Sequence, residues 1–547
     1  MPPVLLSDLD RCRPAAALAD TFAPERRRVL PYVADGIPDG RMLGAGELSR
    51  APAIAYPLAR TGWFRISVGV FNGFWRPYRE QRLELRLAGD AAWSTLVLPP
   101  PSDLPWGIPL DDDDVGPRIT EVPWRTVELR GEDLLLRQPR AVPLAAQTVA
   151  AQGAEGYVAY LRLDPLAPHE APGRDPGTRR LFAYDDTWNA FFEHLRPLTP
   201  DDGADAYRTQ IEVYRDTDVA RIYWEGAHGD VCHYPTRVGR TWDAVAGGSW
   251  PRAGDRNVVE TWRGWRAAGF DPYALAVQHA HDAGLQIHAT YRFGWGAFYW
   301  PPAFDAYNAG GFFDRHPEWR CIRPDGTPDT ALSLAFPQVR AFIVDVLREL
   351  AAYEVDGLAL LFNGQPPFAG TEAPDPLAPA TCLLEEIRAA IPGLPLTAWV
   401  FGARDQNMAY GLDVETWVGR RLVDTIVPYS SEPKGFSWGD AWTGPAAIAY
   451  WTNLVRGSGV LLAPNVMPRD LDDAGHRRQA LRLYRAGVEA LSFWDTFLRR
   501  SLWTGAIPRL GHRDELEAWE AAGEPAAERR TRRIREVAGW QFGLLPE

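Results

Sequence analysis

Carboxylates follow short apolar runs at three places after residue 215 of the chain. These residues are Glu225, Glu432 and Asp495. Two carboxyl groups on either side of a bond can serve as proton donor and as base or nucleophile, which is the chemistry of glycosidic bond cleavage. We therefore take Asp495 and Glu432 as the first candidate catalytic pair and Glu225 as the next candidate.

The same strand ends carry side chains that suit a sugar ligand. Aromatic faces stack on sugar rings, and Arg, Asn, His and Asp hydrogen-bond to hydroxyl groups. For any single acid, a salt bridge in a surface loop is an equally good interpretation, so their shared position is what favours a site. The candidate substrate-binding residues are Trp224, His228, Asp230, Tyr234, Tyr291, Arg292, Trp295, Asn363, Asp405, Asn465 and Trp494.

Short β-branched runs alternate with amphipathic segments in this part of the chain, as in parallel strands joined by helices. Segment 271–284 has Asp271 as a helix N-cap, Pro272 in the first turn and Gly284 at the end. A doubly wound open sheet is the alternative, but no G-x-G-x-x-G follows the first expected strand. The expected strands are 219–225, 285–292, 331–335, 355–363, 394–402, 423–430, 459–465 and 487–495. This pattern predicts a (β/α)8 TIM barrel with its active site at the carboxyl ends of the strands.

The first part of the chain alternates with period two, as half-buried strands do. The clearest runs are 63–71, 81–89, 126–131 and 156–163. They predict an antiparallel β-sandwich, which either binds sugar or only packs on its neighbour. The predicted fold is therefore α/β, a TIM barrel preceded by a β-sandwich domain. The predicted divisions are an extension at 1–24, the sandwich at 25–165, a Pro- and Gly-rich linker at 166–183 and the barrel at 184–547.

Composition excludes several classes of partner. The net charge is −13, with no block of Lys and Arg, so we expect no nucleic acid. The start does not read as a signal peptide, and no apolar run approaches the roughly 18 residues of a membrane span. These features predict a cytoplasmic protein without membrane contact, and they leave the oligomeric state open. The carbohydrate partner is predicted from the side chains at the strand ends.

Metals and cofactors are not expected. The four cysteines are scattered without a CxxC pair, which argues against a zinc ribbon or a disulfide scaffold. The segment HGDVCH at 228–233 crowds four candidate ligands, but no second pair follows at zinc spacing. A loop facing the substrate is the preferred interpretation of this segment.

Six segments, taken in order, resemble the glycosyl-hydrolase-like 10 family of barrels over about residues 215–500. They are GDVCHYPTRVG (229–239), AHDAGLQIHATYRF (280–293), HPEW (316–319), LSLAFPQVR (332–340), YEVDGLAL (353–360) and GLDVETWVGRRLVDTIVPY (411–429). The resemblance implies a (β/α)8 barrel that acts on a glycoside. In that family the fourth strand reads acidic-Gly, three residues, then a catalytic aspartate; here Asp356 and Gly357 match and Leu361 stands at the aspartate's place.

Three functions follow from these patterns. The first is a glycoside hydrolase with an unusual pair of rim carboxylates, acting on an oligo- or polysaccharide. The alternative is a carbohydrate-binding barrel without catalysis, because Leu361 replaces the expected aspartate. The third is a metal-dependent isomerase or lyase that uses HGDVCH.

Overall fold

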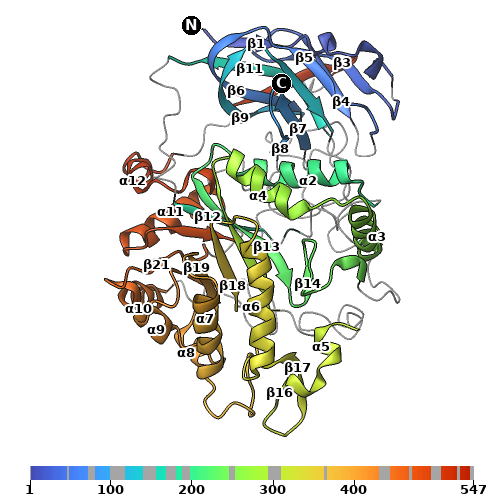
Figure 1. The fold of residues 1–547 in the computed structure, drawn as a ribbon. Coiled ribbons are helices and arrows are strands. Elements are labelled where there is room, and N and C mark those ends of the chain that lie inside the picture. The colour runs from blue at the N-terminus through green and yellow to red at the C-terminus, as the bar shows by residue number, and fades with distance from the viewer. Residues whose placement is uncertain are drawn as a thin grey trace.

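The computed structural model of the protein combines antiparallel sheets with a curled parallel sheet and its helices (Figure 1). It describes residues 2–21, 23–45, 49–71, 81–98, 117–138, 156–167, 180–185, 187, 197–244, 253–293, 310–362, 366–429, 444–466, 471–494, 507–525 and 530–541. Mixed α/β architecture is therefore confirmed for these residues.

The parallel sheet has the order β21-β20-β19-β18-β15-β13-β12-β22, and each neighbouring pair in it is parallel. The ninth strand, β14 (Val231–Cys232), pairs antiparallel with the end of β13. The edges approach each other, because Asn465 after β21 forms a parallel bridge with Ser492 of β22. The bounds are β12 (Leu181–Asp185), β13 (Val219–His228), β15 (Gln286–Arg292), β18 (Gly357–Leu361), β19 (Leu396–Phe401), β20 (Thr425–Tyr429), β21 (Leu461–Leu462) and β22 (Leu491–Phe493).

One expected strand is wrong. Residues Pro328–Leu332 form β17, which pairs antiparallel with β16 (Arg320–Ile322) in a separate sheet. β15 and β18 pair directly where that strand was expected. The eighth parallel strand is β12, which lies between β13 and β22 and begins within the predicted linker. All five residues of β12 are buried, as expected for a strand covered on both faces. The strand that carries Glu225 is therefore the second of the sheet along the chain.

The helix prediction at 271–284 is confirmed. Helix α4 (Pro272–Asp282) begins after Asp271, whose side chain accepts from the N–H groups of Tyr273 and Ala274, and Gly284 has φ of +70°. Helix α6 (Pro337–Ala351) buries one apolar face. The other helices are α2 (Pro200–Glu212), α3 (Ala253–Ala267), α5 (Phe312–Arg315), α7 (Ala378–Ala390), α8 (Arg404–Ala409), α9 (Val414–Gly419), α10 (Pro445–Val455), α11 (Asp473–Arg485) and α12 (Arg513–Ala521).

Two further sheets lie at the amino-terminal end. In the larger one, strand β23 pairs with both β9 and β3, so the path β3-β4-β11-β6-β9-β23 returns to its start. The smaller sheet has the order β5-β10-β7-β8. The bounds are β1 (Val4–Leu6), β2 (Leu18–Ala19), β3 (Arg27–Ala34), β4 (Gly40–Ala45), β5 (Ile54–Pro57), β6 (Thr61–Phe71), β7 (Gln81–Leu87), β8 (Ser94–Leu98), β9 (Arg118–Arg130), β10 (Asp133–Arg137), β11 (Gly156–Pro165), β23 (Thr531–Val537) and β24 (Trp540–Gln541).

Side chains of both amino-terminal sheets share one hydrophobic cluster. Leu85 and Leu134 of the smaller sheet and Ile66 and Leu161 of the larger one belong to it. This shared burial stabilises the contact between the two sheets. The division of the chain at residues 166–183 stays a prediction. Strand β23, near the end of the described residues, pairs with β3 and β9 of the larger antiparallel sheet.

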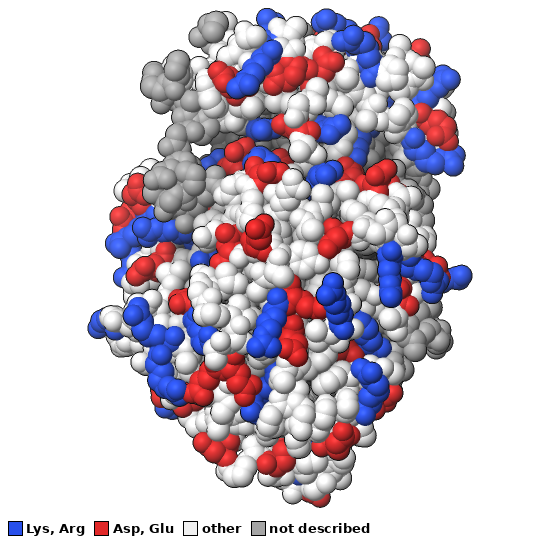
Figure 2. Space-filling model, in the orientation of Figure 1, with Lys and Arg blue, Asp and Glu red and all other residues white. Residues whose placement is uncertain are grey.

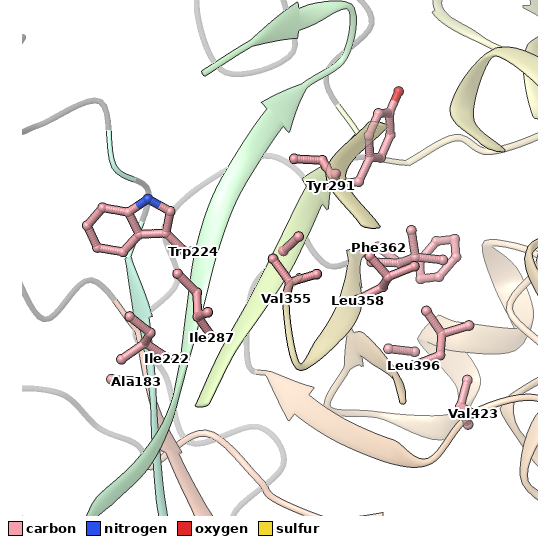
Figure 3. Close-up of a cluster of buried hydrophobic side chains, with 14 of the residues drawn as sticks. Ala183, Ile222, Trp224, Ile287, Tyr291, Val355, Leu358, Phe362, Leu396 and Val423 are labelled. Carbon is pink, nitrogen blue, oxygen red and sulfur yellow. The ribbon is translucent and has the colours of Figure 1, made fainter. Parts of the chain in front are cut away.

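The parallel sheet buries different side chains on its two faces. Figure 3 shows Trp224, Ile287 and Leu358 in the large cluster that also contains residues of the helices. Tyr184, Leu361 and Trp399 belong to a second, smaller cluster. Because side chains alternate along a strand, the first cluster lies between sheet and helices, and the second lies inside the curled sheet.

Ion pairs join the amino-terminal sheets to the rest. Arg137 at the end of β10 lies 2.6 Å from Asp205 of α2, and Arg125 of β9 lies 3.7 Å from Asp216. Figure 1 shows the antiparallel sheets next to α2 and α4. On the face that Figure 2 shows, acidic and basic side chains are interspersed. Ion pairs between exposed side chains contribute little to stability.

Gly357 at the start of β18 should be hard to replace. A Cβ atom built there would lie 2.4 Å from Cε1 of the buried His288. We expect Gly357→Ala to lower the free energy of unfolding by about 1–3 kcal/mol, as overpacking does. Gly264→Ala is the matched control, since Gly264 lies in helix α3 with no neighbouring atom within 4 Å, and alanine there should stabilise. Urea unfolding measures both, and equal stability of Gly357→Ala and the wild type would contradict the packing.

Candidate functional site

Glu225 lies at the carboxyl end of β13, inside the curled sheet. The residue is 1% exposed. Its Oε2 atom accepts a hydrogen bond from the Tyr184 hydroxyl of β12 and lies 3.5 Å from Nη1 of Arg292 on β15. Nδ1 of His228 lies 4.0 Å from Oε1. The neighbouring strands β12, β13 and β15 thus supply the side chains that lie next to the Glu225 carboxyl group.

A β-bulge brings Glu225 and His228 to the same face. The register between β13 and β15 pairs Glu225 with Thr290 but Ala227 with Tyr291, so one residue is inserted between them. Without the bulge, positions three apart would point to opposite faces. Gly226 at this place has no room for a side chain, because a Cβ atom would lie 2.5 Å from Cδ2 of Leu350.

Burial controls the protonation of this cluster. It raises the pKa of Glu225 to about 7, although Arg292 and the hydrogen bond from Tyr184 act in the opposite direction. Burial and the Arg292 guanidinium lower the pKa of His228 well below its ordinary value. At neutral pH the site therefore contains two different groups. The Glu225 carboxyl group can gain or lose its proton, and the His228 imidazole is neutral.

Aromatic rings pack around Tyr184, whose hydroxyl donates to the Glu225 carboxyl group. Trp494, just after β22, stacks on Tyr184 with ring centroids 3.9 Å apart. It lies 4.9 Å from the Tyr429 ring and 5.4 Å from the Trp399 ring. The guanidinium of Arg292 lies 5.7 Å above the Trp494 ring. Arg292, Trp494 and His228 are partly exposed, and they form the outer side of the site.

A second layer of hydrogen bonds holds the Glu225 backbone. The Thr187 hydroxyl donates to the Glu225 carbonyl oxygen at 3.1 Å and lies 2.5 Å from Nδ1 of His233. The Thr187 N–H donates to Asp185 Oδ1 at 2.9 Å, and the Gln210 amide donates to the same oxygen. Thr187 has φ of +53°, which is rare for a β-branched residue and marks a constrained position.

Leu361 occupies the inward position at the end of β18. It pairs in register with Arg292 on one side and with Trp399 on the other, and it is fully buried. The resemblance places a catalytic aspartate here. The described part of the site therefore has an apolar side chain beside Arg292 where an acid was expected.

Three predicted substrate-binding aromatics lie away from Glu225. Trp224 and Tyr291 belong to the cluster between sheet and helices (Figure 3). Because Trp224 precedes Glu225 and Tyr291 precedes Arg292, alternation sends each pair to opposite faces. Tyr234 packs on Tyr273 and Tyr353, again outside the sheet. The expectation that all of these side chains meet did not allow for this alternation.

The remaining described candidates have separate partners. Asp230 pairs with Arg240 at 2.9 Å and accepts from the Phe312 N–H at 2.6 Å, so it ties two loops together. Asp405 is exposed over 96% of its side chain. Asn465 is buried and donates from Nδ2 to the Ser492 carbonyl at 3.3 Å. The structure thus brings Glu225, His228, Arg292 and Trp494 together, with Asn465 inside the same sheet.

Four candidates lie outside the described residues. They are Asp495, Glu432, Trp295 and Asn363. Tyr184, Asp185 and Thr187 were missed, because no strand was predicted before residue 219 and the predicted linker extended to residue 183. The run LFAYD is an apolar stretch that ends in an acid, as are the expected strands at 219–225 and 487–495, and that pattern could have identified them.

The described residues offer no cluster of three His, Cys, Asp or Glu side chains that could hold a metal ion. Within HGDVCH, Asp230 binds Arg240 and His233 binds Thr187, so these side chains face different partners. Helices in the described part of the chain are too short or too polar to cross a membrane.

Comparisons with known proteins give no family. The chain matches no protein-family model and no curated protein. Among solved structures, it is similar to an alpha-galactosidase from Thermus thermophilus (15% identity, 90% of this chain and 94% of that chain, TM-score 0.34). It is also similar to the Group IV chitinase of Ostrinia furnacalis (11%, 62% and 100%, TM-score 0.36) and to a ruminal GH26 endo-beta-1,4-mannanase (9%, 94% and 96%, TM-score 0.30). TM-scores of this size carry no argument about fold or function.

The raised pKa of Glu225 predicts how stability depends on pH. The folded protein keeps the Glu225 proton up to about pH 7, whereas the unfolded chain loses it near the ordinary value of 4.5. The folded state therefore binds more protons in this window, and its stability falls as pH rises, by up to about 3 kcal/mol from this group. We expect Glu225→Gln to remove that fall, measured by urea unfolding between pH 4.5 and 8.

Glu212 provides a control of opposite sign. Burial acts to raise its pKa, but His279 and Arg215 outweigh burial and lower it. Its contribution is present above the ordinary value and is lost as the pH falls, so Glu212→Gln should lose stability mainly at neutral pH. A wild-type pH dependence that Glu225→Gln leaves unchanged would contradict the assignment of the shift to Glu225.

Proposed function

We propose that the protein is a glycoside hydrolase acting on an oligo- or polysaccharide, with Glu225 as its proton donor. The observation that carries the proposal is a buried carboxyl group, hydrogen-bonded by Tyr184 and 3.5 Å from Arg292, at the carboxyl end of a parallel sheet. Burial raises the pKa of this group to about 7. A general acid works best when its pKa is near the working pH. In glycosidases, burial of a glutamic acid is the usual means of raising its pKa to that value.

A second carboxyl group completes this chemistry. Asp495 and Glu432 remain our candidates for it. Supporting them, Trp494 directly precedes Asp495 and Tyr429 stands three positions before Glu432, and these two aromatic residues pack together beside Tyr184. Glu225 then donates the proton, and one of the other two acids acts as the base or nucleophile.

The proposed fold is a (β/α)8 barrel behind an amino-terminal β-sandwich. The bridge between Asn465 and Ser492 supports closure of the parallel sheet. The hydrophobic cluster shared by the two antiparallel sheets supports the sandwich. The order of motifs shared with the glycosyl-hydrolase-like 10 family agrees with such a barrel, and active sites of barrels lie at the carboxyl ends of the strands.

Sugar hydroxyl groups would find partners around Glu225. The Arg292 guanidinium and the His228 imidazole lie beside the carboxyl group and are partly exposed. They can hydrogen-bond to sugar hydroxyl groups at the outer side of the site. The partly exposed ring of Trp494 offers an apolar face for a sugar ring.

The second candidate function is carbohydrate binding without catalysis. Leu361 favours it, because this residue removes the acid that the resembling family uses beside Arg292. Binding of an oligosaccharide by calorimetry, with no product from a panel of oligosaccharides over long incubation, would establish this function. Release of product that depends on Glu225 would reject it.

Glu225→Gln tests the proton donor. We expect kcat on natural oligosaccharides to fall by about 10²–10⁴-fold, with wild-type folding. On dinitrophenyl glycosides, whose leaving group needs no proton, the variant should lose much less activity. Glu25→Gln is the control, because Glu25 is exposed, pairs with Arg50 and lies outside the parallel sheet, so this variant should keep full activity. Equal loss on both substrate types would show that Glu225 is not the proton donor.

Tyr184→Phe tests the tuning of Glu225. The Tyr184 hydrogen bond lowers the pKa of the carboxyl against the effect of burial, so removing the hydroxyl should raise that pKa further. An acid that must be protonated loses activity as the pH rises through its pKa. We therefore expect the alkaline limb of the pH profile of kcat/KM, near pH 7 in the wild type, to move upward in Tyr184→Phe. A limb that stays in place would show that another group sets it.

A further inference from the structure

Arg27, the first residue of β3, carries a guanidinium group that is enclosed by protein. The residue is 2% exposed, and the alternation along β3 places it on the same face as Val29. Val29 belongs to the hydrophobic cluster of the amino-terminal sheets, together with Cys12 and Ala17. The positive charge therefore lies beside an apolar cluster and not in solvent.

This guanidinium group has no counterion among the residues that the structure describes. Nε and Nη2 of Arg27 are buried and hydrogen-bond to no atom there. The carboxylates next to Cys12 in the chain are occupied elsewhere: Asp8 accepts from the Tyr56 hydroxyl at 2.6 Å, and Asp10 lies 3.2 Å from Nε of Arg41. A buried charge without a partner costs several kcal/mol.

Neither Arg27 nor Cys12 can relieve this cost by changing its charge at neutral pH. Burial lowers the pKa of Arg27 to about 10, with Cys12 opposing it, so the guanidinium stays protonated. Burial raises the pKa of the Cys12 thiol to about 12, with Arg27 opposing it. The thiol therefore remains neutral and offers a weak S–H donor.

We propose that Arg27 and Cys12 form a buried binding site for a small monovalent anion such as chloride or bromide. One negative charge neutralises one guanidinium group, whereas sulfate or phosphate would leave an uncompensated negative charge beside apolar side chains. A buried ion must also lose its water. Weakly hydrated bromide is therefore preferred to chloride, and fluoride is excluded.

Thermal unfolding of the full chain in sodium fluoride, chloride or bromide at equal ionic strength tests the site. An ion that binds only the folded state raises Tm in a saturable way, so we expect a rise with bromide, a smaller rise with chloride and none with fluoride. Arg27→Met should lose this dependence and be at least as stable as the wild type in fluoride. Arg28→Met is the matched control, since Arg28 is the exposed neighbour on the same strand and should respond like the wild type.

A bromide-soaked crystal of the wild-type protein gives a second measurement that needs no variant. An anomalous peak beside Arg27 supports the site, and bromide found only at exposed arginines overturns it. Equal halide responses of the wild type and Arg27→Met also overturn it. Thiolate absorbance at neutral pH that disappears in Cys12→Ala would show that Cys12 itself supplies the charge, against the proposal.

Discussion

A parallel sheet whose edge strands are bridged encloses its inward side chains, and the candidate site depends on that enclosure. Tyr184 and Trp399 are fully buried and Glu225 is 1% exposed, so their polar groups must find partners within the protein or bear the cost of desolvation. Glu225 receives a hydrogen bond from Tyr184 and lies near Arg292, yet burial outweighs both and raises its pKa to about 7. On a surface loop the same carboxyl group would be ionised and would have no proton to give at neutral pH.

One inserted residue in β13 decides which groups share the enclosed space. The bulge around Gly226 turns His228 to the face of Glu225 and leaves Ala227 on the outer face. Contact with Leu350 of α6 leaves no room for a Cβ atom at Gly226, so helix packing outside the sheet fixes the geometry inside it. This dependence explains why a glycine directly follows Glu225 in this strand.

Apolar periodicity predicted most strands of the parallel sheet, and the residue types Asp271, Pro272 and Gly284 predicted the ends of α4. Both features follow from local sequence. Periodicity did not predict β12, since LFAYD adjoins a Pro- and Gly-rich segment that resembles a linker. Nor did it separate Trp224 from Glu225, because period two shows that neighbours face opposite ways without showing which one faces inward. The bulge changes that phase within the strand, and only the pairing with β15 reveals it. The roles of Asp495 and Glu432 stay predictions.

The leucine at position 361 and the glutamate at position 225 belong to one electrostatic arrangement. Arg292 on β15 has β13 on one side and β18 on the other, in register with His228 and Leu361. An aspartate at position 361 would be ionised beside Arg292. Its negative charge would pair with the guanidinium and raise the pKa of Glu225 further, away from neutral pH. A chain that takes its buried acid from β13 therefore favours an apolar residue on β18, and Leu361 fills that position against Trp399.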